Sequence, residues 1–178
     1  IKTANFENAQ SSEISANSGK MTKTATSDFT NAGTITAYGV EIVAIGDFTN
    51  SGSFISENGD INITSASFEN SQSSEISANS GKITISATGD FTNAGVISAY
   101  EVEIEATGDF TNSGNIDSST GLLKITAKSI TTFGEIKANS GDFESTEAGI
   151  VFGENSENTF EAGLTVTSAG NFENYGAI

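Results

Sequence analysis

The side chains that could carry out chemistry in this 178-residue chain are almost all carboxylates. The chain has 23 Asp and Glu residues against seven basic residues, all lysines, and it lacks His, Cys and Arg. The commonest general bases and nucleophiles are therefore missing. Paired carboxylates alone can hydrolyse glycosidic bonds. However, the acids with the clearest pattern recur along the chain instead of gathering once: Glu41, Asp47, Glu103, Glu105 and Asp109. Recurring acids are typical of a solvated face, so we expect no enzymatic activity.

Four of the aspartates that directly precede a phenylalanine are the candidates for a metal site: Asp28, Asp47, Asp90 and Asp109. If successive copies of a repeat stack, two neighbouring carboxylates lie ~5 Å apart, close enough to share Ca²⁺. The glycine-rich nonapeptide of calcium-binding β-rolls is absent. An Asp between a Gly and a strand is commonly a turn residue that bonds to nearby backbone. We favour the turn role and predict neither a metal nor another cofactor.

Two tyrosines and one connecting segment are the candidates for binding a partner. Tyr38 and Tyr100 occupy equivalent positions 62 residues apart. Exposed rings of this kind can stack on sugars, although packing against a turn is the favoured alternative. Residues 153–159 look like a longer loop, and insertions in repeat proteins often mark a binding face. The same segment can equally be a connection without function. Its candidate contacts are Glu154, Asn155, Glu157 and Asn158.

All of these residues belong to an internal repeat. Residues 6–67 align without a gap on residues 68–129, with roughly 42 identities in 62 positions. Within each unit a shorter period of 19–23 residues is marked by one apolar column: Phe6, Phe29, Phe48, Phe68, Phe91, Phe110, Ile130, Ile150 and Phe172. Each unit is therefore three turns. We interpret residues 1–178 as one repeat segment of a longer protein, with near-duplicate units 6–67 and 68–129 and degenerate coils in 130–178.

The pattern inside one period predicts the fold. Apolar residues occupy every second position in three short runs, and Gly, Asn, Asp and Ser gather between the runs, which is typical of short strands. A leucine-rich repeat would need far more than three leucines, and a β-propeller has a longer period. We predict an all-β parallel β-helix, or β-solenoid, of about nine coils of ~20 residues, with three short strands per coil.

Three further features of the repeat give specific expectations. A second inward column should run from Ile14 through Ile136 and continue at Phe160 and Ile178. The Asn two residues after each column Phe should form an amide ladder in the interior. Lys23 stands where the duplicate has Ile85, so we expect its side chain to turn outward or its strand to be irregular.

The net charge of −16 and the absence of long apolar runs limit the partners. A strongly acidic chain is repelled by nucleic acid phosphates and by anionic lipids. A membrane helix needs ~20 consecutive apolar residues, and no run approaches that length. We therefore expect neither nucleic acid binding nor membrane insertion. The absence of Cys fits a reducing cytosol and an exported chain equally.

The segments Gly46-Asp47-Phe48-Thr49-Asn50-Ser51-Gly52 and Gly108 to Gly114 resemble the haemagglutinin repeats of the filamentous haemagglutinin family. The resemblance implies a right-handed parallel β-helix, secretion through a dedicated outer-membrane transporter, and a place outside the cell or on the bacterial surface. It implies a structural and adhesive stalk that presents binding or toxic regions to a receptor or glycan of a host or neighbouring cell. Two alternatives stay open: a fibre formed by end-to-end self-association through exposed strand edges, and a polysaccharide-processing β-helix enzyme.

Overall fold

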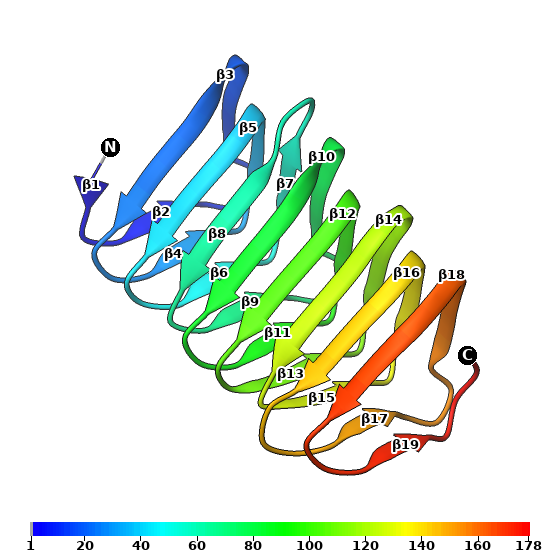
Figure 1. The fold of residues 1–178 in the computed structure, drawn as a ribbon. Helices are drawn as coiled ribbons and strands as arrows, with labels where there is room; N and C mark the ends of the chain where they lie inside the picture. The colour runs from blue at the N-terminus through cyan, green and yellow to red at the C-terminus, as the bar shows by residue number, and fades with distance from the viewer. Residues whose placement is uncertain (1) are drawn as a thin grey trace.

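The chain folds into a solenoid of stacked coils (Figure 1). The computed structural model describes residues 2–178, with every side chain in that range except that of Ser119. These residues contain no helix, and their 19 strands form two parallel sheets. Each strand pairs with its counterpart in the next coil, and that is how a chain of short strands satisfies its backbone hydrogen bonds.

One sheet has nine short strands, one from each successive coil. They are β2 (Phe6–Asn8), β4 (Phe29–Asn31), β6 (Phe48–Asn50), β9 (Phe68–Asn70), β11 (Phe91–Asn93), β13 (Asp109–Asn112), β15 (Ser129–Thr132), β17 (Ile150–Phe152) and β19 (Phe172–Asn174). The column that marks the repeat runs through this sheet in register, from Phe6 paired with Phe29 to Ile150 paired with Phe172. The predicted column is confirmed over its whole length.

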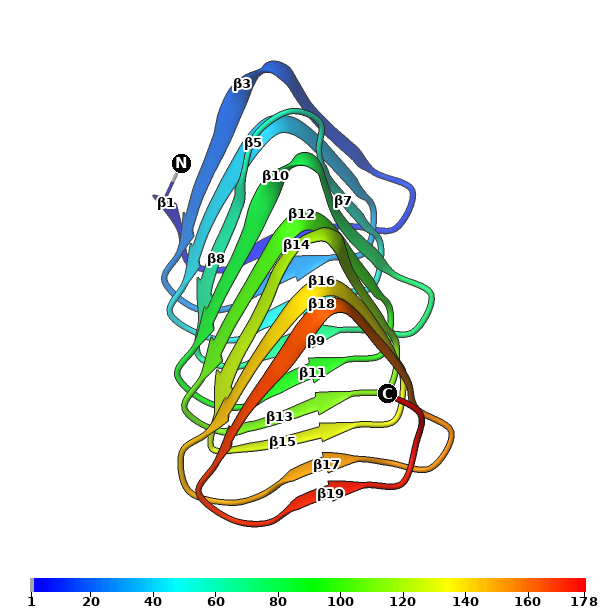
Figure 2. The ribbon, with the colours of Figure 1, turned by 45° about the vertical axis from the view of Figure 1, so that its right-hand side comes forward.

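The other sheet has ten strands, most of them long. They are β1 (Lys2–Thr3), β3 (Glu13–Ala25), β5 (Thr34–Ala44), β7 (Ser53–Ser56), β8 (Ile61–Ser65), β10 (Glu75–Ala87), β12 (Val96–Ala106), β14 (Asn115–Ala127), β16 (Glu135–Ser145) and β18 (Glu157–Ser168). Each long strand covers two sides of a triangular coil and bends at the corner between them (Figure 2). The bend appears as a shift in register, for example between Ser98 and Val102 of β12.

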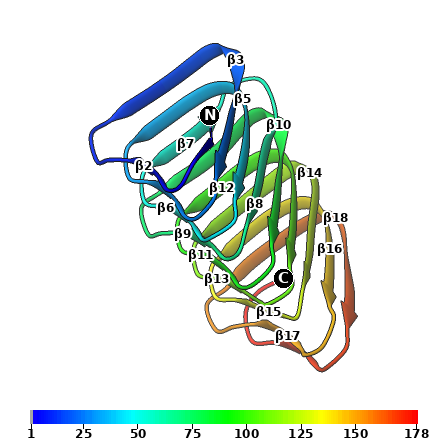
Figure 3. The ribbon, with the colours of Figure 1, turned by 90° about the vertical axis from the view of Figure 1, so that its left-hand side faces the viewer.

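The predicted fold is confirmed, with two refinements. Three sides per coil are present, but two of them share one continuous strand, except where the corner separates β7 from β8. Nine short strands delimit eight complete turns of about 21 residues. In Figure 2, where the C-terminal coils lie nearer the viewer, the chain runs counterclockwise as it comes forward, so the solenoid is right-handed. Figure 3 shows the same stack from the N-terminal side.

The interior is built from columns of like side chains. From Phe6 to Phe110 the rings stack nearly parallel, with centroids 4.4–5.2 Å apart. Beside them runs an amide ladder in which each Asn Nδ2 donates to the Asn Oδ1 of the next coil at 2.8–2.9 Å, through Asn8, Asn31, Asn50, Asn70, Asn93 and Asn112. It ends where Asn112 donates to Thr132 Oγ1 at 3.2 Å. Asn174, which was expected to continue it, is exposed and bonds to Gly176 O instead.

Two expectations about the columns are wrong. Asn158, and not Phe160, follows Ile136 in the second inward column, because β18 pairs with β16 two residues earlier than expected. Lys23 neither turns outward nor distorts its strand. It pairs in register with Ile42, and its Nζ lies 4.5 Å from the centroid of the Phe6 ring, a cation–π contact.

Candidate functional site

The four aspartates proposed as metal ligands tie neighbouring coils together. Asp28 Oδ1 accepts the backbone N–H of Asp47 at 3.1 Å, and Asp90 Oδ1 accepts that of Asp109 at 2.9 Å. Asp47 and Asp109 in turn accept hydroxyls from Ser67 and Ser129 of the next coil, at 2.6 and 2.8 Å. All four carboxylates are exposed, and within residues 2–178 no three or more acidic side chains gather into a possible metal site. The geometry is that of turn residues.

The segment predicted as a loop over residues 153–159 is shorter than expected. The turn covers residues 153–156, and β18 begins at Glu157. Asn155 has a φ of 66°, which matches Ser11 and Ser73 in the turns 9–12 and 71–74. The turn is therefore the third copy of a corner loop, seen on one edge in Figure 2.

This shorter turn separates the four candidate contacts of the segment. Glu154, Asn155 and Glu157 are exposed. Asn158 is only 3% exposed and donates inward, to Ser156 Oγ and to Ala177 O, both at 3.1 Å. Its side chain is out of reach of a surface ligand. Each corner loop ends with a Ser, at positions 12, 74 and 156, and a Glu follows it as the first residue of the next strand. This repeated Ser-Glu pair was the sequence signal for the correct alignment of β18.

The same edge carries a groove that the sequence reasoning missed. It has a volume of about 680 Å³ and is bounded at one end by Ser73 and Ser74 of the second corner loop. Its floor contains Gly95, Gly114 and Gly134. These coils turn the corner in two residues, whereas the longer coils need four, so differences in coil length produce the groove. The sequence signal for the groove was the length of the repeat, which varies between 19 and 23 residues.

The two candidate tyrosines lie at the corner where the long strands bend. Tyr38 of β5 is 49% exposed and Tyr100 of β12 is 57% exposed, so each ring presents about half of its surface to solvent. Tyr100 lines a hollow with a volume of about 280 Å³, together with residues of β10 and β14. The backbone oxygen of Tyr38 accepts from Ser56 Oγ at 3.0 Å.

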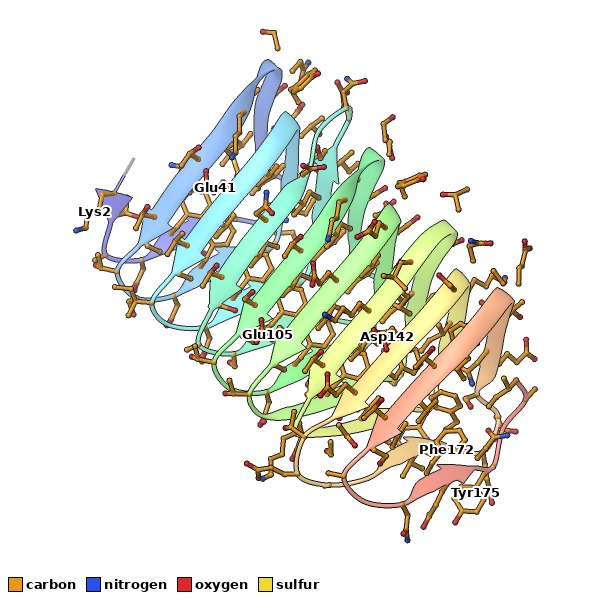
Figure 4. The ribbon with its side chains drawn as sticks, in the orientation of Figure 1. Lys2, Glu41, Glu105, Asp142, Phe172 and Tyr175 are labelled. Carbon is orange, nitrogen blue, oxygen red and sulfur yellow. The ribbon has the colours of Figure 1, made fainter. Side chains whose placement is uncertain are left out.

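The acids on the part of each long strand that follows the bend spread along the rod and do not converge. The labelled Glu41, Glu105 and Asp142 show this in Figure 4. Ion pairs connect successive coils there: Lys82 lies 2.8 Å from Glu101 and 2.7 Å from Glu103. The hydrogen bonds that Lys82 donates to Glu101 and Glu103 raise the pKa of Lys82, and the bond to Glu103 lowers the pKa of Glu103. Both shifts favour the charged forms, which suits a structural ion pair better than a general acid or base.

The repeat that builds these surfaces also identifies the family. The sequence matches the haemagglutinin repeat over residues 7–52, 53–95 and 70–178. The chain belongs to the haemagglutinin repeat family. The haemagglutinin repeat family is a structural and adhesin family and not an enzymatic one, and it implies a secreted exoprotein. No match was found among curated proteins or among solved structures. Within residues 2–178 the haemagglutinin-repeat chain has no helix long and apolar enough to cross a membrane.

Proposed function

We propose that this chain is a stalk segment of a large secreted bacterial surface exoprotein, a rigid rod that presents binding or toxic regions. The observation that carries the proposal is the continuity of the interior columns. The Phe stack and the Asn ladder run through six successive coils, and the aliphatic columns continue beyond them.

Columns of this kind make a rod stiff. Bending the solenoid would open inter-coil hydrogen bonds on its convex side, and all three sides carry such bonds. Eight steps of ~4.8 Å give a rod about 38 Å long. Each coil touches only its neighbours, so length can be added by adding coils without changing the rest.

The composition fits a route of secretion through an outer-membrane transporter. A chain with a net charge of −16 and no Cys remains soluble while unfolded and needs no oxidation to fold. Coil-by-coil pairing also lets it fold progressively as it emerges. We therefore infer that its partners are that transporter and a receptor or glycan on a host or neighbouring cell.

A deletion of one repeat unit tests the rod. Removal of residues 68–129 joins Ser67 to Ile130, which keeps all columns in register, and should shorten the rod by three steps, about 14 Å. The maximum dimension from small-angle X-ray scattering measures the change. The matched control removes residues 78–129, which joins a strand interior to the start of a short strand and should break the stack of coils at that junction. An in-register variant that unfolds, or that keeps the original length, would contradict the proposal.

A further inference from the structure

The hollow beside Tyr100 combines one exposed ring with a set of hydrogen-bonding side chains. It spans three coils, with the ring contributed by the middle coil. The polar residues that line it are Ser77, Asn79, Ser80, Ser98, Asp117 and Thr120. Ser77 Oγ donates to Asn79 Oδ1 at 3.0 Å, which orients the Asn79 amide and leaves its Nδ2 as a donor.

The first repeat unit provides a natural comparison. Tyr38 occupies the position of Tyr100, and Ser15 Oγ donates to Asn17 Oδ1 as in the second unit. The next coil differs, because Ile55 stands where the second unit has Asp117. The corner there is also remodelled, since β7 ends at Ser56 and the backbone N–H of Asn58 donates to Tyr38 O at 3.3 Å. The first copy keeps the ring, lacks a carboxylate at the position of Asp117, and carries Glu57 two residues further on.

We propose that the Tyr100 hollow binds one neutral sugar residue of a glycan, and that Tyr38 does not. A pyranose has an apolar C–H face that packs on an aromatic ring and hydroxyls around its edge. Hydroxyl, amide and carboxylate groups beside the ring supply both donors and acceptors for that edge, and a carboxylate accepts several hydrogen bonds at once. The volume of about 280 Å³ lies just below that of sites for drug-sized ligands, about 300–1,000 Å³, so one sugar ring fits it better than a longer saccharide.

The charge of the chain selects among sugars. Asp117 lies in the hollow opposite Lys137 of β16, and Glu101 pairs with Lys82, so the local charges are partly balanced; the field that selects is that of the whole chain, which carries −16. Sialic acids, uronic acids and sulfated sugars are repelled in this environment, whereas neutral hexoses and N-acetylhexosamines are not. The ligand class is therefore a neutral sugar.

The affinity of one such site is low. A ligand of about 12 non-hydrogen atoms at ordinary ligand efficiency has a Kd in the millimolar range. Useful adhesion then requires several copies on one surface, where multivalency raises the avidity. This inference rests on the glycan partner of the proposed function, to which it gives a sugar class and a site, whereas the rod itself does not depend on it.

Saturation-transfer difference NMR on the full 178-residue chain tests the proposal, because the method detects weak ligands. Methyl glycosides of neutral hexoses and N-acetylhexosamines serve as probes at about 10 mM, roughly fivefold above a Kd of about 2 mM. At least one should receive saturation, strongest on the protons of one ring face. Tyr100→Ala should weaken its binding at least tenfold, whereas Tyr38→Ala, the matched control, should leave it unchanged.

Two further variants keep the test decisive if Tyr100→Ala does not fold. Tyr100→Phe retains the stacking face and should retain most of the binding, and Asp117→Ile copies the first unit and should abolish it. Transfer to none of the neutral glycosides, equal losses from Tyr38→Ala and Tyr100→Ala, or equally tight binding of methyl glucuronide would each overturn the proposal. The length measurement on the unit deletion is independent of all these outcomes.

Discussion

The amide ladder allows a comparison between two almost identical substitutions, Asn50→Ala and Asn93→Ala. Both side chains are completely buried, and each donates to the next Asn and to two backbone oxygens. Each also accepts from the preceding Asn at 2.8 Å. Replacement by Ala removes the same bonds and the same volume in both cases, so most of the cost is common to the two variants.

The difference lies in the acceptor that each substitution leaves behind. Asn70 Oδ1, the acceptor for Asn50, also lies 2.7 Å from Ser74 Oγ, whose single proton is shared with Ser71 O at 2.5 Å and can turn to Asn70 Oδ1 in Asn50→Ala. Asn112 Oδ1, the acceptor for Asn93, has no second donor among the described residues. A buried acceptor without a donor costs about 1–3 kcal/mol. We expect Asn93→Ala to lower the free energy of unfolding by about 1–3 kcal/mol more than Asn50→Ala does.

Urea denaturation followed by far-UV circular dichroism measures both variants, and the slope with urea shows whether they unfold alike. Ser74→Ala provides the control. In the double variant with Asn50→Ala, the Ser74 hydroxyl is no longer there to bond to Asn70 Oδ1. The loss in free energy of unfolding should therefore exceed the sum of the two single losses by about 1–2 kcal/mol. Equal losses for the two Asn variants, or strict additivity with Ser74→Ala, would refute the idea that the ladder acts through satisfied acceptors.

Two other predictions concern corner packing and ion pairs. A Cβ on Gly114 would overlap the backbone oxygen of Gly95 in the preceding coil, so Gly114→Ala should destabilise the fold by about 1–3 kcal/mol, whereas Gly19→Ala, with open space around its Cβ, should change the urea midpoint little. Because Lys82 lowers the pKa of Glu103, the stability from this pair is present above the unfolded carboxyl pKa of about 4.3 and is lost as the pH falls through the lower folded pKa. At neutral pH, Glu103→Gln should therefore lower the free energy of unfolding by less than about 1 kcal/mol, since both side chains are about one-third exposed. This difference from the unsubstituted chain should vanish in acid and shrink in high salt.

The sequence predicts the interior of this protein well because the constraint on it is simple. In a parallel solenoid each inward residue lies on the equivalent residue of the next coil, so an alignment of repeats is also a register of strands. The Phe column from Phe6 to Phe172 and the ladder from Asn8 to Asn112 follow from that one rule. The rule fails at Phe160. Its apolar side chain suggests a place in the second inward column, but Asn158 occupies that position. Hydrophobicity alone places a residue inside, but the corner loop sets the register.

The exterior is less predictable because it depends on how coils of unequal length adjoin. The repeat gives the positions of Tyr38 and Tyr100 but not the hollow beside Tyr100, which needs side chains from two neighbouring coils. The groove over Gly114 likewise exists only because the second corner loop projects beyond it. Lys23 is a related case, since its contact with Phe6 joins residues of one coil that the strand pattern treats separately.

The two repeat units separate what builds the rod from what distinguishes its surfaces. Their interior positions differ mainly by exchanges of one apolar side chain for another, such as Phe54 with Ile116 and Ile61 with Leu123. An exchange on the outside, by contrast, changes chemistry, as Ile55 to Asp117 does next to an otherwise equivalent tyrosine. Outward side chains contribute little to folding because they bury little surface, so they can change without loss of the rod. Single outward substitutions can therefore change the surface chemistry of a solenoid without changing the rod, and differences between its repeats are the place to look for binding sites.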